Sequence, residues 1–276
     1  MFATAALARR IEEAECSLVT DGARAVGERL GPGSVEIVPL GGGAAIFAGL
    51  GSPYTKVAGL GFAPLDDEAF AGAERMLVGR GAPVQVEIST LADPSIAERL
   101  TRRGYALRGF ENVLAASLDE AARGGWSAGL TIEMAPADST EWIDIVTMGF
   151  EHPDTFDGPP SHESFSSEML RQVFMDSSRA EGFQRFIARR RGSPAGGAGL
   201  RVWKGVALLC GAATLPEHRR QGVQTALLRH RLSEAARGGC DIAVVTTQPG
   251  SKSQENVQRQ GFALVYSRAI LVGGGH

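Results

Sequence analysis

Residues 206–237 join an apolar stretch to a helical stretch through a short basic turn, and this segment constrains the fold more than any other part of the chain. Residues 206–214 are mostly apolar, which predicts a buried central strand. Within residues 225–237, apolar side chains recur at helical spacing, which predicts a helix packed on a sheet. The predicted buried positions are Leu228, Leu232 and Ala235/Ala236, with Arg229 and Arg231 outside.

The turn between the strand and the helix has the chemistry of an anion-binding cradle. Arg219 and Arg220 carry permanent positive charge, and Gly222 lets a bound group approach the backbone closely. The helix N-terminus adds unpaired N–H groups and the positive end of a dipole. Together these features predict a pyrophosphate site. Taken alone, the motif also fits an ordinary basic turn at the start of a helix.

Residues 219–224, Arg-Arg-Gln-Gly-Val-Gln, resemble the Arg/Gln-x-x-Gly-x-Gly/Ala loop with which the GNAT N-acetyltransferase superfamily grips the pyrophosphate of acetyl-CoA. The elements that follow match the order of that family. They are a strand over 241–246, a helix over 253–260 closed by Gly261-Phe262, and a last strand over 263–272. The resemblance covers roughly residues 129–272. Gln224 departs from the motif, but the cradle survives because its donors are backbone groups. No P-loop or Rossmann motif occurs in the chain.

The resemblance implies how the cofactor, acetyl-CoA, is held. Backbone groups of residues 212–214 would pair with the acetyl-pantetheine arm like an added strand, which would separate this strand from 241–246. Backbone N–H groups across residues 220–225 would hold the pyrophosphate. The implied cofactor-binding set is Ala212, Ala213, Thr214, Arg219, Arg220, Gln221, Gly222, Val223, Gln224, Thr225 and Asn256.

The resemblance also implies an N-acetyltransferase, in which a primary amine of a small molecule attacks the thioester directly. Many members carry a Tyr four residues before Gly-Phe as general acid, and here Val257 holds that position. Ser253 or Asn256 would substitute for it, or they only solvate the helix. Glu151, beside His152, is the candidate general base, with plain surface as the alternative. A non-catalytic acyl-CoA-binding or sensor protein is the alternative function, and a peptide acetyltransferase is a weaker one.

The composition limits the partners, the compartment and the kinds of site that we expect for this chain. The chain has 276 residues and a net charge of −3, which disfavours a dedicated nucleic-acid partner. No apolar run is long enough to span a bilayer, and the N-terminus reads as an amphipathic helix rather than a signal peptide. Three widely spaced cysteines predict neither a disulfide framework nor a metal site. A cytoplasmic protein without a metal is expected, and a homodimer is left open. The run Arg189-Arg190-Arg191 is either a solvated hairpin edge or part of a rim that attracts the CoA phosphates.

The chain repeats itself at an offset of 157 residues. Residues 102–107 match residues 259–264, and each copy reads strand, helix, Gly-aromatic, strand. The predicted fold class is α/β (α+β), with two tandem GNAT-like domains, each a mixed, mostly antiparallel twisted sheet flanked by helices. The expected domains are a degenerate copy over 1–118, a linker over 119–129 and an acetyl-CoA-binding copy over 130–276. In the first copy Asp66, Asp67 and Glu68 crowd the helix start that corresponds to the cradle, where they cap the helix and repel a pyrophosphate.

The remaining elements of the second copy follow from local signals. We expect a strand over 130–135, a helix over 139–149, a helix from 161 to 174 and a strand over 183–189. Gly41-Gly42-Gly43 and Gly196-Gly197 both read as hairpin turns, the second within a turn over 194–199.

Overall fold

A computed structural model describes residues 1–118, 129–153 and 165–273. The chain divides into two compact units. The N-terminal unit contains residues 2–113 and the final strand from Leu264, whereas the C-terminal unit contains the described residues from Leu114 to Ala263. Residues 119–128 of the expected linker lie outside the described residues, so the domain boundaries stay a proposal.

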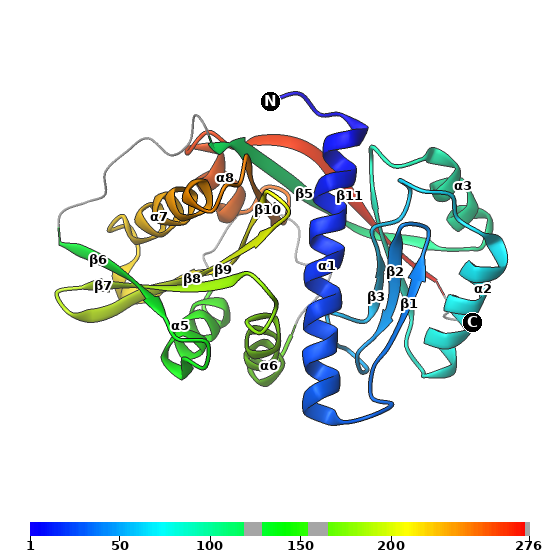
Figure 1. The fold of residues 1–276 in the computed structure, drawn as a ribbon, viewed down its shortest axis with the longest axis horizontal. Coiled ribbons are helices and arrows are strands. Elements are labelled where there is room, and N and C mark those ends of the chain that lie inside the picture. The colour runs from blue at the N-terminus through cyan, green and yellow to red at the C-terminus, as the bar shows by residue number, and fades with distance from the viewer. Residues whose placement is uncertain (119–128, 154–164, 274–276) are drawn as a thin grey trace. The chain divides into compact units, whose positions relative to one another are not determined.

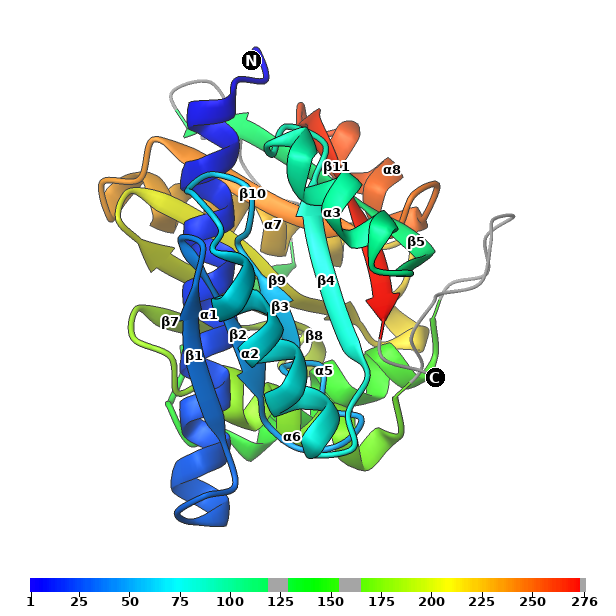
Figure 2. The same cartoon turned by 90° about the vertical axis from the view of Figure 1, so that its right-hand side faces the viewer.

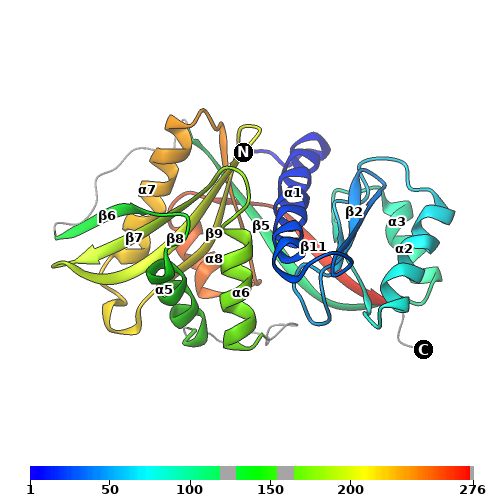
Figure 3. The ribbon, with the colours of Figure 1, turned by 60° about the horizontal axis from the view of Figure 1, so that its bottom comes forward.

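In the N-terminal unit α2 and α3 cover one face of the strands and α1 lies on the other (Figures 2 and 3). The strand order is β1-β2-β3-β4-β11-β5, and all the pairs given a register are antiparallel except the parallel pair β3–β4. The elements are α1 (Ala5–Leu30), β1 (Glu36–Leu40), β2 (Gly43–Phe47), β3 (Lys56–Ala58), α2 (Asp67–Gly79), β4 (Val84–Ser89), α3 (Pro94–Arg102), β5 (Ala106–Ser117) and β11 (Ala263–Gly273).

The last strand of the chain is held in the N-terminal unit by buried polar contacts. On β11, Arg268 donates to Glu12 of α1 at 2.9 Å and to Glu111 of β5 at 2.9 Å, and the Tyr266 hydroxyl donates to Glu12 at 2.7 Å. Removing one member of such a buried pair would leave the other charge without a partner. These contacts therefore hold β11 in place. The strand expected to complete the second domain therefore pairs with β4 of the N-terminal unit.

In the C-terminal unit α7 lies on one face of the sheet and α5 and α6 lie on the other (Figures 1 and 3). The strand order is β10-β9-β8-β7-β6, in which only β9 and β10 are parallel. The elements are β6 (Leu130–Ala135), α5 (Thr140–Glu151), α6 (Ser167–Ser177), β7 (Phe183–Arg190), β8 (Ser193–Trp203), β9 (Val206–Thr214), the short 3-10 helix η1 (Pro216–His218), α7 (Val223–Arg237), β10 (Ile242–Thr247) and α8 (Lys252–Gln258).

The two units confirm the predicted fold class of mixed, mostly antiparallel sheets flanked by helices. Equivalent elements keep the 157-residue offset: β5 begins at Ala106 and β11 at Ala263. Leu228, Leu232 and Ala235 of α7 are buried as expected. Residues 161–164, where α6 was expected to begin, lie outside the described residues, and Ser166 caps the described helix. No described helix combines the length and apolar character that a membrane crossing requires.

The prediction of a hairpin turn at Gly196-Gly197 is wrong, whereas Gly41 and Gly42 do form the turn between β1 and β2. Gly196 and Gly197 lie inside β8, and the turn falls at Arg191 and Gly192, which have positive φ. A Cβ at Gly196 would lie 2.7 Å from the Ala213 carbonyl oxygen, and one at Gly197 would lie 3.0 Å from Val146 of α5. These glycines are therefore needed for close packing of helices on the sheet.

Candidate functional site

The central strand β9 leaves its neighbour β10 partway along its length. The two strands pair in parallel at three positions, the last being Val244 opposite Leu208. Strand β9 continues to Thr214 and β10 continues to Thr247, but the paired positions end at Leu208 and Val244. The ladder between β9 and β10 therefore ends at Leu208, and Ala212 to Thr214 lie on the part of β9 beyond it.

A bulge in β9 marks the point of divergence. The register between β8 and β9 shifts between Gly197 and Gly199, and Gly211 adopts a positive φ of 55°. Arg231 of α7 reaches this bulge and donates to the Gly199 carbonyl oxygen at 3.0 Å. A bulge re-aims a strand and is common beside functional sites. Arg231 thus satisfies a carbonyl at the place where β9 changes direction.

The expectation that Arg231 faces solvent is wrong, because only 2% of it is exposed. It lies four residues after Leu227 and four before Ala235, so helical spacing places it in the buried stripe, a signal that its charge obscured. Burial lowers the pKa of its guanidinium to about 10. Its guanidinium donates hydrogen bonds to the carbonyl oxygens of Gly199 and Leu227.

Beyond β9, the loop into α7 has an unusual backbone. Arg220 has a φ of 57°, and Gly222 is the left-handed N-cap of α7 with a φ of 81°. The first helical bond runs from Ala226 to Gly222 at 3.0 Å, so the N–H groups of residues 223–225 precede the ladder. Their donors, with the positive end of the helix dipole, are available to an anion.

The N-terminus of α7 differs from those of the other described α-helices. It has no side-chain cap and no acidic residue in its first turn. Each of the others has a side-chain oxygen that accepts a hydrogen bond from its first turn. These caps are Thr4 for α1, Asp66 for α2, Asp93 for α3, Ser139 for α5, Ser166 for α6 and Ser251 for α8. Among the described α-helices, the one without a side-chain cap is therefore the first α-helix after the diverging strand.

The sequence-predicted cofactor residues gather around these two features. Ala212 to Thr214 lie on the unpaired edge of β9, Arg219 to Gly222 form the loop, and Gln224 and Thr225 are half-buried in the first turn of α7. Val223 instead turns its side chain into the core under the sheet, where it is 1% exposed. Asn256 is half-buried on α8.

The candidate catalytic residue lies at the end of α5. Glu151 is the last residue of that helix and is exposed, and its neighbour His152 accepts through its carbonyl oxygen a hydrogen bond from Arg219. The structure therefore brings one arginine of the loop to the segment that carries Glu151. Val257, at the position where the family often has Tyr, is buried at 5% exposure. The exposed Glu217 makes no ion pair with any described residue. No cluster among the described residues is arranged to hold a metal ion.

Comparison with known proteins agrees with this geometry. Residues 149–262 match the profile of the acetyltransferase (GNAT) family. Among solved structures, a GCN5-related N-acetyltransferase from Kribbella flavida is 17% identical, with a TM-score of 0.66 over 95% of this chain and 96% of that one. A tandem GNAT protein from the clavulanic acid biosynthesis pathway is 12% identical, with a TM-score of 0.63 over 91% and 87%. A GCN5-related N-acetyltransferase from Sphaerobacter thermophilus is 13% identical, with a TM-score of 0.55 over 87% and 75%.

A search of curated protein sequences finds no significant match. The structural neighbours establish the fold over nearly the whole chain, and the profile covers the unit with the diverging strand and the vacant helix N-terminus. Acyl transfer from an acyl-CoA is the general chemistry of this family. Residues 149–262 of this chain are similar to the acetyltransferase (GNAT) family, whose profile they match.

Proposed function

We propose that the C-terminal unit binds acetyl-CoA and transfers its acetyl group to a primary amine of a small molecule. The observation that carries this proposal is the conjunction of the unpaired edge of β9 with the uncapped N-terminus of α7. The edge suits an amide-bearing arm, which would add to the sheet like a strand. The helix N-terminus suits a pyrophosphate. Both features lie within residues 209–225, so one extended ligand would meet them in turn.

The residues that would hold acetyl-CoA are those of the edge and the loop. Backbone groups of Ala212 to Thr214 would pair with its arm, and N–H groups from Arg220 to Thr225 would surround its pyrophosphate. When bound, it supplies an acetyl group activated as a thioester. A backbone N–H on the β9 edge would stabilise negative charge that develops on the acetyl oxygen. The arginines add charge that water only partly screens.

The chemical step needs two proton transfers. The acceptor ammonium must lose a proton before its nitrogen attacks, and Glu151 at the end of α5 is the proposed base. The C–N bond then forms, the C–S bond breaks, and the thiolate takes up a proton. With Val257 buried where a Tyr is frequent, Ser253 or Asn256 of α8 would deliver that proton, directly or through water. No described side chain makes a hydrogen bond with Asn256 or Ser253, which leaves both available.

Calorimetric titration with acetyl-CoA and with CoA tests the first half of the proposal. We expect one site per chain with a dissociation constant in the micromolar range. Two sites would mean that the N-terminal unit also binds the cofactor, and absence of binding would overturn the proposal. Release of free thiol is then measured over a panel of primary amines, with peptides included as competitors. Turnover on small amines but not on peptides is the expected result.

A second function is favoured by one observation, the buried Val257 in place of a proton donor. A non-catalytic acyl-CoA sensor needs the same edge and cradle but no donor and no base. Binding of acetyl-CoA without thiol release on any amine of the panel would favour the sensor over the enzyme.

We further propose that the N-terminal unit does not bind acetyl-CoA. Analytical ultracentrifugation would test the homodimer that the sequence leaves open.

A further inference from the structure

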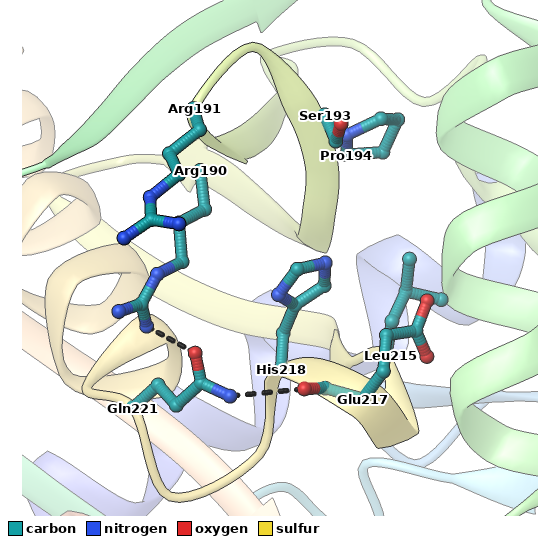
Figure 4. Close-up of a pocket in the computed structure, with 8 residues that line it drawn as sticks. All are labelled: Arg190, Arg191, Ser193, Pro194, Leu215, Glu217, His218 and Gln221. Atoms are coloured by element: carbon teal, nitrogen blue, oxygen red, sulfur yellow. Dashed lines mark hydrogen bonds between the residues drawn. The ribbon is translucent and has the colours of Figure 1, made fainter.

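A pocket of about 670 Å³ lies beside the cradle, between the β7–β8 turn and the loop that leads into α7 (Figure 4). Its polar lining includes Arg190, Arg191 and Ser193 from the turn and Glu217, His218 and Gln221 from the loop. Gln221 belongs to both the pocket and the cradle, so the two sites share a wall.

The three consecutive arginines of the turn have different environments. Arg189 is neutralised, because it donates to Glu133 at 2.7 Å and to both carboxylate oxygens of Glu141 at 2.7 and 2.9 Å. These bonds lower the pKa of the Glu141 carboxyl. Arg189 is therefore occupied by structural ion pairs and does not line the pocket.

The next two arginines, Arg190 and Arg191, contribute their positive charge to the pocket. Arg190 donates to the side-chain oxygen of Gln221, a neutral group, and Gln221 in turn donates to the Glu217 carbonyl oxygen at 2.9 Å. This chain of bonds fixes the Arg190 guanidinium against the start of the cradle. The exposed Arg191 makes no hydrogen bond or ion pair with any described residue.

Figure 4 shows how the charges of the pocket are arranged. The Arg190 and Arg191 side chains lie on one side, the His218 ring points up between them and Ser193, and the Glu217 carboxylate lies across the pocket beside Leu215. The basic groups thus converge, while the single acidic side chain of the lining is directed away from them. Such an arrangement attracts an anion with several acceptor oxygens.

The backbone at the β7–β8 turn is that of a two-residue hairpin, which carries Arg191 at its tip. Arg191 has a φ of 52°, a left-handed conformation that costs free energy for a residue with a side chain. The adjacent Gly192, with a φ of 83°, adopts the same region freely. Arg220 on the cradle side is a second non-glycine residue with positive φ. Lys204 and Gly205 have the same pair of positive φ angles in the turn between β8 and β9, as is usual for two-residue hairpins.

We infer that this pocket is a phosphate-monoester subsite, which receives the 3′-phosphate of the CoA whose pyrophosphate occupies the cradle. The inference rests on the proposed function and specifies the ligand group that the neighbouring basic residues bind. Two guanidinium groups and an imidazole offer donors to the three terminal oxygens of a phosphate monoester, whereas a carboxylate has only two. The turn of β7 and β8 thereby becomes a specificity element for CoA over its 3′-dephosphorylated form.

The test combines a change in the protein with a change in the ligand. Wild type, Arg191→Gln and Arg190→Gln are titrated with CoA and with 3′-dephospho-CoA at fixed ionic strength. Wild type should bind CoA about ten- to a hundredfold more tightly than dephospho-CoA, as expected for charged hydrogen bonds to one phosphate. Arg191→Gln should remove most of that preference by weakening CoA alone. Arg190→Gln should weaken CoA more than dephospho-CoA.

Lys204→Gln provides the matched control, because Lys204 is exposed, has a φ of 45° and lies in the turn at the other end of β8. It should leave the preference for CoA intact. Equal weakening of both ligands by Arg191→Gln, or equal affinity of wild type for both ligands, would overturn the subsite while leaving the proposed function standing. If wild type bound neither CoA nor dephospho-CoA, both the subsite and the proposed function would be overturned. Circular dichroism melting curves confirm that each variant is folded.

Discussion

The helices α7 and α2 hold equivalent places in the two units, yet their N-termini are built for opposite purposes. At α2, Asp66 accepts a hydrogen bond from the Ala69 N–H at 2.8 Å, and Asp67 and Glu68 fill the first turn. At α7 there is no side-chain cap and no acid. The carboxylates of α2 occupy the position and satisfy the donors that an anion would use. A few side chains therefore decide whether a helix N-terminus is sealed or left as a site.

The parallel strand pairs of the two units differ in the same sense. Strand β3 pairs with β4 at Val57 and ends at Ala58, whereas β9 continues to Thr214 after its last pair at Leu208. Gly59, with a φ of 78°, turns the chain away directly after β3, and Cys16 of α1 lies against it. Among the described residues, the place in the N-terminal unit that corresponds to the cradle thus has neither a strand that runs past its parallel partner nor an uncapped helix start. We expect acetyl-CoA binding to require both features together.

The largest effect is expected from a substitution that closes the uncapped N-terminus of α7. Gly222→Glu places bulk and negative charge at the N-cap of α7, where it resembles the sealed α2, and repulsion should weaken acetyl-CoA roughly a hundredfold or more. Calorimetric titration measures the loss. Gly239→Glu is the control, because Gly239 has a φ of 76°, open space around it and a place just beyond the C-terminus of α7. Unchanged affinity in Gly222→Glu would show that the cradle is wrongly placed.

The next prediction concerns the packing that supports the cradle. Gly196→Ala puts a Cβ 2.7 Å from the Ala213 carbonyl oxygen and 2.9 Å from Val223, at the junction of β9 with α7. Overpacking against backbone should lower the free energy of unfolding by about 3 kcal/mol, the upper part of the usual range. Urea denaturation measures it. Gly238→Ala, whose new Cβ would lie 3.4 Å from its nearest neighbour, should cost much less. Equal costs would contradict the tight contact.

A smaller effect is expected at the bulge. Arg231→Leu leaves the Gly199 carbonyl oxygen without its side-chain donor in a buried place, which should cost about 2 kcal/mol of stability. Strand β9 should also relax toward regular pairing with β8. The affinity for acetyl-CoA should therefore fall measurably, in addition to the loss of stability. Arg231→Lys, which keeps a charged donor, should retain part of both. A stability loss with unchanged affinity would confine Arg231 to packing.

The sequence predicts some features of the two units and not others, and the difference depends on whether a feature rests on local or on long-range contacts. The strand–loop–helix order, the caps at Asp66 and the vacant start of α7 follow from local chemistry, so they were predictable. Arg231 and Gly196 were misplaced because their roles depend on contacts with β8 and β9 that lie far away in the sequence. The place of β11 in the N-terminal unit depends on Glu12, at the other end of the chain. Long-range pairing of this kind leaves no local signal.

The smallest expected effect sharpens the comparison between the helices. Asp66→Ala removes the cap of α2 and should lower stability by about 1 kcal/mol, as loss of an N-cap usually does. Affinity for acetyl-CoA should stay unchanged, because Asp67, Glu68 and the short β3 remain and no strand edge is created. Thermal denaturation and calorimetric titration on the same sample measure the two quantities. A second binding site in this variant would mean that the cap alone closes the N-terminal unit. An unchanged single site is the expected result, because the two carboxylates that remain in the first turn repel a pyrophosphate and the short β3 offers the extended cofactor too few contacts.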